Sequence, residues 1–308
     1  MVSLDCLAAL DCLQWLRTGL RAAESLERHQ SSIAHDARKC QQIFRIRLTK
    51  QAEEWRVIGD DQLLAAERHL HQKYRWDRDL SLRLDAQHWL RDSYSPLQLA
   101  GWTKGNMNYL EYSQPLYLIQ NRIIDDWLCS APDQPKHPEL TARQLCSMPS
   151  YLVVKKEHPL VALGSSASLA DVRRYPLLPL PSQSFPVFEA MIASLGLNNS
   201  VQPPGDCSLP IEDLLIGIAS PLTISLYGPD YVALPVEIPV SVGDVLVVRT
   251  EYADHPRTTR LLEDLLSHLH SIGAGNTNIR VLDKAPSADT SSASASIQAV
   301  LTEEIRRS

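Results

Sequence analysis

The stretch that decides the fold is residues 18–44, which read TGLRAAESLERHQSSIAHDARKCQQIF. It holds two helical patterns, a short one over 20–26 and a longer one that follows the polar run 28–32. The short pattern contains two alanines, Ala22 and Ala23, which are small enough for another helix to cross closely. The longer helix is expected to be capped by Gln30 or Ser31. Its buried face is predicted by apolar side chains at helical spacing, Ile33, Ala37, Cys40 and Phe44.

The segments on either side complete a small domain over residues 1–59. Upstream, a leucine recurs every three residues from Leu4 to Leu16, which predicts a first helix. Downstream, residues 45–48 and 55–58 alternate apolar and polar side chains around a polar middle, as in a short hairpin. Three helices followed by a hairpin predict a winged helix-turn-helix.

A single helix is predicted over residues 60–79. No glycine or proline occurs between Asp60 and Arg78. The seam Leu63, Ala66, Leu70 and Tyr74 has coiled-coil spacing, which suits pairing with a second copy of the chain. We expect a linker and dimerisation helix.

Strand-like and helical runs alternate over residues 80–275, which predicts βαβ crossovers and a mostly parallel sheet. Residues 276–308 are rich in Ser and Ala and are expected to form a flexible tail. Strands are predicted at 82–86, 107–112, 126–130, 151–155, 176–180 and 244–250, a further stretch at 211–219, and helices at 97–104, 115–122, 168–174, 185–195 and 256–272.

Length and composition describe an ordinary globular chain of 308 residues with 44% hydrophobic and 21% charged residues, long enough for two compact domains. The formal net charge of −6 restricts any nucleic-acid surface to a local region. Residues 1–59 contain nine Lys or Arg against seven Asp or Glu. The six cysteines show no CxxC and no zinc spacing, so reduced thiols and no metal site are expected. With no signal peptide and no long apolar run, the cytoplasm is the expected compartment.

The order of these segments resembles the LysR-type transcriptional regulators over roughly residues 4–272. The N-terminal half of the resemblance lies in 18–26, in 29–35 and in the Leu48-Thr49 pair. The second half lies in 156–160, Lys-Glu-His-Pro-Leu, and in 168–176, Ser-Leu-Ala-Asp-Val-Arg-Arg-Tyr-Pro. The resemblance implies a DNA-binding regulator with a two-lobed, periplasmic-binding-protein-like (Rossmann-like) α/β domain that binds a small-molecule effector, and a homodimer or homotetramer on double-stranded DNA.

Site residues follow from the implied fold. Polar side chains near the start of the recognition helix face bases, and basic side chains around it face phosphates. Effector ligands lie beyond the carboxyl ends of parallel strands, near helix N-termini, where an organic anion is one candidate. The DNA-binding residues expected are Arg21, Gln30, Ser31, Ser32, His35, Arg38, Lys39, Arg47 and Arg56. The effector-binding residues expected are Gln87, His88, Ser113, Gln114, Ser182, Gln183 and Ser184.

Two alternatives remain at this level. Where the family commonly has Ser-Arg, this chain has Ala34-His35 followed by Asp36, whose carboxylate would repel phosphates. That substitution favours a sensor with a degenerate helix-turn-helix that acts through protein–protein interaction. The bilobal fold also suits a solute-binding-like domain with weak hydrolytic activity. However, the chain contains no Gly-x-Ser-x-Gly, no phosphate loop and no dinucleotide fingerprint, so no catalytic residue and no cofactor is assigned.

Overall fold

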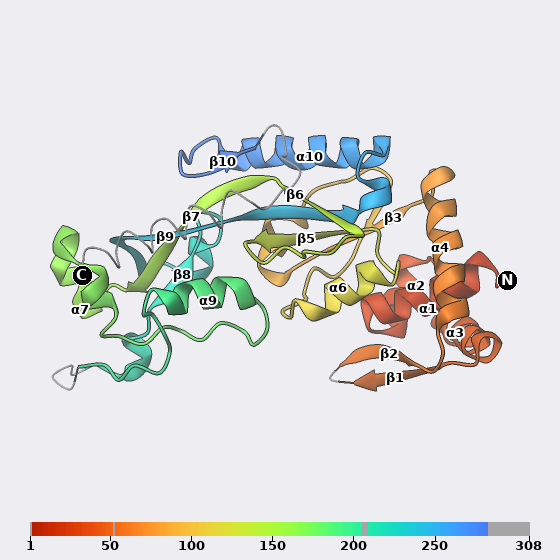
Figure 1. Ribbon diagram of the computed structural model, residues 1–308, viewed down its shortest axis with the longest axis horizontal. Coiled ribbons are helices and arrows are strands. Elements are labelled where there is room, and N and C mark those ends of the chain that lie inside the picture. Colours follow the sequence, from red (N-terminus) through yellow and green to blue (C-terminus); the bar gives the residue numbers. More distant parts are fainter. Residues whose placement is uncertain (1, 52, 205–208, 283–308) are drawn as a thin grey trace.

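The computed structural model describes residues 2–51, 53–204 and 209–282 and has an elongated shape, with the N-terminal unit at one end (Figure 1). This unit confirms the expected order of three helices, a hairpin and a linker helix. Its elements are α1 (Leu4–Leu16), α2 (Gly19–Ser25), α3 (Gln30–Phe44), the antiparallel strands β1 (Arg47–Gln51) and β2 (Glu54–Ile58), and α4 (Gln62–Asp77).

Local sequence explains where the first helices begin and end. The Ser3 hydroxyl accepts a hydrogen bond from the Cys6 amide and caps α1, and the Thr18 hydroxyl accepts one from the Arg21 amide and caps α2. Between them Arg17 adopts the left-handed conformation, with φ of 67°, that ends α1. The expected cap of α3 by Gln30 or Ser31 is wrong, because the helix begins one residue earlier, after His29, and no side chain caps it.

Helix α4 has one buried face and one free face. Its buried face carries charged side chains, including Arg68 and Arg75, that contact the rest of the chain. The predicted seam lies on the opposite face, where Leu63 is 72% exposed, Leu70 48% and Tyr74 42%. An apolar row this exposed on a helix is available to a second copy of the chain.

The remainder of the chain forms an α/β domain of two lobes. The elements of the near lobe, beside the N-terminal unit, are β3 (Leu82–Ala86), η1 (His88–Leu90), α5 (Arg91–Tyr94), β4 (Trp102–Lys104), α6 (Ser113–Gln120), β5 (Asp126–Ala131), β6 (Leu140–Gln144), η5 (Thr250–Tyr252), α10 (Pro256–Gly273) and β10 (Arg280–Val281). Those of the far lobe are α7 (Pro159–Leu163), η2 (Gly164–Ser166), α8 (Leu169–Val172), α9 (Pro186–Ser194), η3 (Ile211–Asp213), β8 (Gly217–Ala219) and η4 (Ile224–Tyr227).

Two long strands, β7 (Cys146–Lys155) and β9 (Tyr231–Arg249), run through both lobes (Figure 1). The first half of β9 pairs with β7, and its second half pairs with β5 and β6. Each lobe has its own apolar core: the far one gathers around Leu152, Phe188 and Ile216, and the near one around Leu84, Leu128 and Leu246.

The sheet is mixed, which corrects the expectation of a mostly parallel sheet. Its order is β10-β7-β9-β5-β3-β4, and among the strands that the structure describes only the pairs β3–β4 and β3–β5 are parallel. The antiparallel pairs all involve β7 or β9. Strand β9 runs antiparallel to β5, β6 and β7. The chain therefore does not follow the simple βαβ repeat that the alternation of strand-like and helical runs predicts.

Three predicted elements are corrected. Residues 97–104 are not a helix but a turn at Gly101, with φ of 80°, followed by β4. Residues 107–112 and 176–180 contribute only single bridges, Tyr109 with Gln87 and Leu177 with Ile216. Prolines at 176 and 179 lack the amide that a strand ladder needs.

The C-terminal region differs in part from the expected tail. Residues 280–281 form β10, which pairs with β7, and Val281 packs against the near-lobe core. Residues 283–308 of the expected tail lie outside the described residues. In the described ranges, five cysteines are buried and unpaired, and no helix combines the length and apolar character needed to cross a membrane.

Candidate nucleic-acid interface and ligand cleft

Helix α3 places its polar side outward, as its spacing predicts. Ile33, Ala37 and Cys40 are buried against the N-terminal core, with exposures of 0–2%. Gln30, Ser31 and His35 are exposed, and Ser32 is half-buried. Since neither Gln30 nor Ser31 caps the helix, their side chains are available to a partner. The face that would enter a DNA groove is therefore open in the single chain.

The carboxylate of Asp36, which the sequence places among these polar residues, is already compensated. Arg28 donates to its Oδ2 at 2.6 Å, and the Cys6 thiol donates to its Oδ1 at 3.4 Å. The Arg28 hydrogen bond holds the pKa of Asp36 below its usual value. Because the negative charge faces an arginine, it opposes a phosphate less than its position in the sequence implies.

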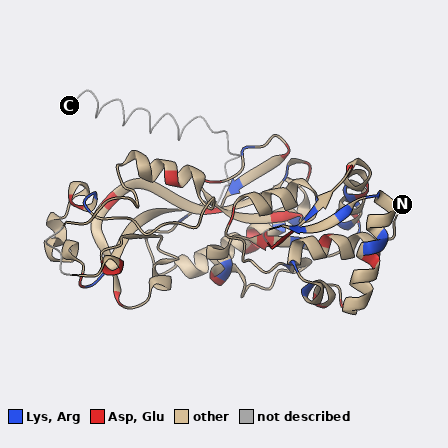
Figure 2. Cartoon of the chain, turned by 90° about the horizontal axis from the view of Figure 1, so that it is seen from below, with Lys and Arg blue, Asp and Glu red and all other residues tan. Residues whose placement is uncertain are grey.

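Most of the expected phosphate-contacting side chains are on the surface. Arg21, Arg38, Lys39 and Arg47 are exposed. Arg56 is not: it is half-buried, and its guanidinium lies 4.4 Å from the ring centre of Tyr117 on α6. Figure 2 shows positive and negative residues mixed over the N-terminal elements. The exposed basic side chains are therefore interspersed with acidic ones and form at most a local positive surface, as the formal net charge of −6 predicts.

A cleft of about 240 Å³ lies between the two lobes. Trp89 and Leu90 of the near lobe and Phe185 and Phe188 of the far lobe supply aromatic and apolar walls. The rings of Trp89 and Phe185 meet across the cleft with centroids 4.0 Å apart. The floor includes residues of β7 and β9, the strands that join the lobes. The polar residues lining it are Ser93, Ser130, Ser150, Ser220, Thr223, Tyr227 and Asp244.

Two hydrogen bonds organise the polar side of this cleft. The Trp89 indole donates to the Ser130 hydroxyl at 3.0 Å, and the Tyr94 hydroxyl donates to Asp244 Oδ2 at 2.6 Å. Burial raises the pKa of Asp244 to about 6. The Ser150 hydroxyl is buried without a partner in the described part of the chain.

The seven expected effector-binding residues surround this region without lining the cleft. Gln87 comes nearest, because its buried Oε1 accepts the amide of Ser130, a lining residue, at 3.1 Å. His88 is half-buried in η1. Ser113 and Gln114 open α6, and the Gln114 side-chain amide is buried without a partner among the described residues.

The remaining three, Ser182 to Ser184, lie against the start of α6. The Tyr112 amide donates to the Gln183 carbonyl at 3.1 Å, and the Ser184 hydroxyl donates to the Leu110 carbonyl at 2.5 Å. Ser182 and Gln183 are exposed. The structure therefore brings two of the three expected groups together and places the third beside the cleft.

A further set of buried residues, which the sequence did not single out, joins the N-terminal unit to the near lobe. The Trp15 indole of α1 donates to Asp85 Oδ2 of β3 at 2.5 Å, and the same carboxylate accepts the amides of Ala86 and Met107. Burial raises the pKa of Asp85 to about 7, despite these three donors. Gly105 permits the contact, since a Cβ there would overlap the carboxylate.

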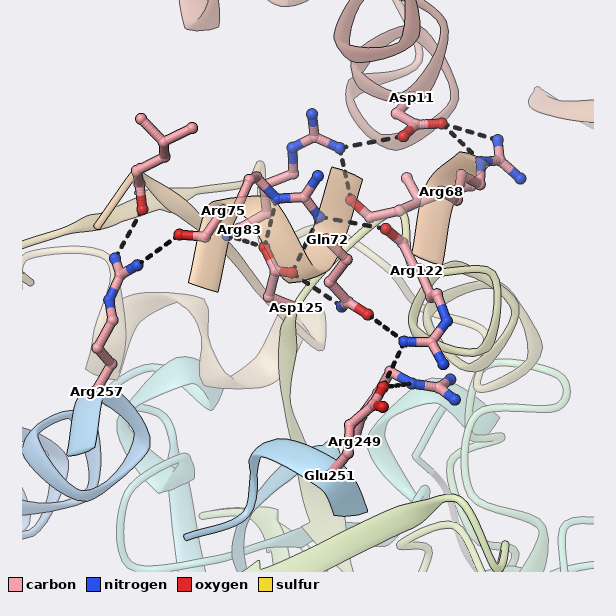
Figure 3. A network of polar contacts seen from close by, with 12 residues as sticks. Asp11, Arg68, Gln72, Arg75, Arg83, Arg122, Asp125, Arg249, Glu251 and Arg257 are labelled. Atoms are coloured by element: carbon pink, nitrogen blue, oxygen red, sulfur yellow. Dashed lines mark hydrogen bonds and ion pairs between the residues drawn. The ribbon is translucent and has the colours of Figure 1, made fainter. Parts of the chain in front are cut away.

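An ionic network continues this junction (Figure 3). Asp11 of α1 accepts from Arg68 of α4 at 2.9 Å and lies 3.5 Å from Arg83 of β3. Arg75 of α4 pairs with Asp125, just before β5, at 3.0 Å. All five side chains are at most 10% exposed. The network thus ties α1 and α4 to the sheet of the near lobe.

Comparison with known proteins identifies the family of this chain. The LysR substrate binding domain model matches residues 109–269, just over half of the chain. No curated protein matches the sequence. A solved full-length OxyR variant from Pseudomonas aeruginosa has a TM-score of 0.59 at 15% identity, over 93% of this chain and 99% of that one. A probable transcriptional regulator from the same organism has a TM-score of 0.54 at 15% identity, over 86% and 97%.

A Corynebacterium glutamicum OxyR mutant, bound to hydrogen peroxide, has a TM-score of 0.50 at 13% identity, over 88% of this chain and 96% of that one. At such identities the structural likeness concerns the fold, an N-terminal helix-turn-helix joined to a two-lobed α/β domain. The family model covers most of that second domain. The chain belongs to the LysR family of transcriptional regulators.

Proposed function

We propose that this chain is a DNA-binding transcriptional regulator whose α/β domain binds a small molecule in the cleft between its lobes and thereby alters promoter binding. The observation that carries the proposal is the free polar face of α3, with exposed Gln30, Ser31 and His35, in the same chain as the matched substrate-binding domain. The proposal includes a cytoplasmic location and a regulatory rather than an enzymatic role.

The alternative of a degenerate helix-turn-helix is not favoured. It rests on Ala34-His35 in place of Ser-Arg and on the charge of Asp36, and the Arg28 guanidinium compensates that charge at 2.6 Å. The recognition helix, α3, carries two exposed basic side chains, Arg38 and Lys39. These side chains suit phosphate contacts, which make affinity depend on salt.

The homodimer is proposed to form along α4. Leu63, Leu70 and Tyr74 expose an apolar row on the face opposite the buried network. Two chains paired there carry two recognition helices, and two-fold symmetry predicts a partly palindromic operator.

The test is binding of the full chain to its own promoter region and to random DNA of equal length at several salt concentrations. Paired Arg38→Ala and Lys39→Ala should weaken binding to both DNAs and reduce the slope of log affinity against log salt by about 0.9 for each lost phosphate contact. Gln30→Ala should instead reduce the preference for the promoter, because a bidentate contact to adenine discriminates by about 1–3 kcal/mol.

Paired Arg91→Ala and Arg260→Ala serve as the control. Both arginines are exposed and lie on α5 and α10, outside the N-terminal unit. They remove the same charge and should leave the salt slope unchanged. A wild-type chain with no preference for its promoter at low salt refutes the proposed function.

A further inference from the structure

The described walls of the cleft between the lobes carry no positive side chain. Of the described residues that line it, none is Lys, Arg or His. The neighbouring His268 lies behind the wall, where its Nε2 donates to the carbonyl of Ser93 at 2.7 Å. A carboxylate or phosphate ligand placed here would lose its hydration without gaining a cationic partner, which is costly in a buried site.

The one carboxylate in the lining is itself short of donors. Asp244 is 2% exposed and accepts the Tyr94 hydroxyl on Oδ2. Among the described residues, no other side chain or amide donates to this carboxylate. A buried acceptor with free capacity is stabilised by a ligand that brings an N–H or O–H group, and more so by one that brings a positive charge.

The side chains that line the cleft favour a ligand with an aromatic framework. Trp89, Phe185 and Phe188 present aromatic surfaces from both lobes, and the Phe185 and Phe188 centroids are 6.1 Å apart. Met148, Leu222 and Val242 add apolar area. Aromatic rings pack edge to face or offset against such walls. The cleft volume of about 240 Å³ has room for a small ring system.

We propose that the cleft binds a small aromatic molecule that carries a hydrogen-bond donor and no negative charge, with the donor directed to Asp244. This inference rests on the proposed function, because it names the class of effector for the same cleft. It replaces the organic anion that the sequence suggested. The Ser150 hydroxyl, which is buried without a partner in the described part of the chain, is available for a further polar contact.

Matched probes test the charge of the ligand on the unaltered full-length protein. Benzylamine, benzyl alcohol and benzoate share one ring and differ in the charge of the substituent, and 1-methylindole differs from indole by one methyl group in place of the N–H donor. Calorimetric titration should show benzylamine and indole binding about ten-fold or more tightly than benzoate and 1-methylindole, as expected for a buried hydrogen bond to a charged group.

Two variants locate the effect. Asp244→Asn keeps an acceptor for Tyr94 but removes the charge, so the preference for benzylamine over benzyl alcohol should disappear. Ala219→Leu places a larger side chain at a lining residue that is 4% exposed, and it should weaken all of the probes. Because the probe series needs no variant, a variant that fails to fold does not remove the test.

Benzoate binding as tightly as benzylamine would overturn the proposal, and so would the absence of measurable binding by every aromatic donor. Promoter binding, measured on the same preparation, distinguishes a failure of the proposed ligand class from a failure of the proposed function. A chain that recognises its promoter but prefers benzoate retains the proposed function and loses only the ligand class. A chain without promoter preference loses the proposed function, whatever binds the cleft.

Discussion

The buried carboxylate at the junction of α1 and β3 gives a quantitative prediction about pH. Asp85 is fully buried and accepts three N–H donors, and burial nevertheless raises its pKa from 3.8 to about 7. The folded chain therefore keeps a proton on Asp85 between about pH 4 and pH 7, where the unfolded chain has lost it. Stability from this group is present at low pH and is lost as the pH rises through that window.

The size of the effect follows from the two pKa values. Integrating proton binding between about pH 5 and pH 8 gives a loss of about 2–3 kcal/mol from Asp85 alone. Asp85→Asn removes the titrating group while keeping a side chain of similar volume. The variant also turns an amide toward the Trp15 indole, so its free energy of unfolding should be lower than that of wild type at pH 5.

The assay is urea unfolding of both proteins at pH 5, 6, 7 and 8. The difference in free energy of unfolding between wild type and Asp85→Asn should shrink by about 2–3 kcal/mol across this range. Asp92→Asn makes the same charge change on an exposed α5 residue and should give parallel curves. If the Asp85→Asn difference is constant with pH, burial does not dominate the titration of Asp85 and the reasoning fails.

Three further substitutions test the described contacts. Gly105→Ala should cost roughly 1–3 kcal/mol in thermal or urea unfolding, because its Cβ overlaps a buried carboxylate, whereas Gly275→Ala, with open space around it, should be nearly neutral. Arg68→Ala should cost roughly 3–5 kcal/mol by leaving Asp11 buried without its closest cation, and adding Asp11→Ala should recover part of that loss. Leu70→Glu should shift the chain toward monomer in analytical ultracentrifugation, and an unchanged dimer would exclude the α4 seam as the interface.

Local signals in the sequence predicted the N-terminal unit well. The spacing of Ile33, Ala37 and Cys40 places one face of α3 in the core, and all three are buried. The same holds for the strand at residues 82–86, whose observed bounds match the predicted ones. These elements depend on periodicity within a few turns or a few residues, which a single sequence displays directly.

The first half of β9 shows why another element was missed. Leu234, Val236, Ile238 and Val240 alternate as a strand requires, and all are buried. Prolines at 235 and 239 interrupt the pattern and argue against a strand when the sequence is read alone. The structure accommodates them where the register between β7 and β9 shifts.

The junction and the cleft depended on contacts that the sequence does not display. Trp15 and Asp85 are 70 residues apart and form one hydrogen bond. The cleft takes its walls from six or more separated segments, so its lack of positive side chains emerges only when the fold assembles them. The polar loop residues predicted from strand ends lie around the cleft, whereas most of its lining is apolar.

The continuous path of β9 has a consequence for how an occupied cleft could act on distant parts of the chain. Pairing of β9 passes from β7 at Val242 to β5 at Gly243 and Asp244, so Asp244 lies where β9 crosses from one lobe to the other. A ligand that hydrogen-bonds to Asp244 therefore contacts the strand that both lobes share. Strand β5 pairs in turn with β3, which carries Asp85, the acceptor of the Trp15 indole of α1, so a continuous hydrogen-bonded path joins the cleft to the N-terminal unit.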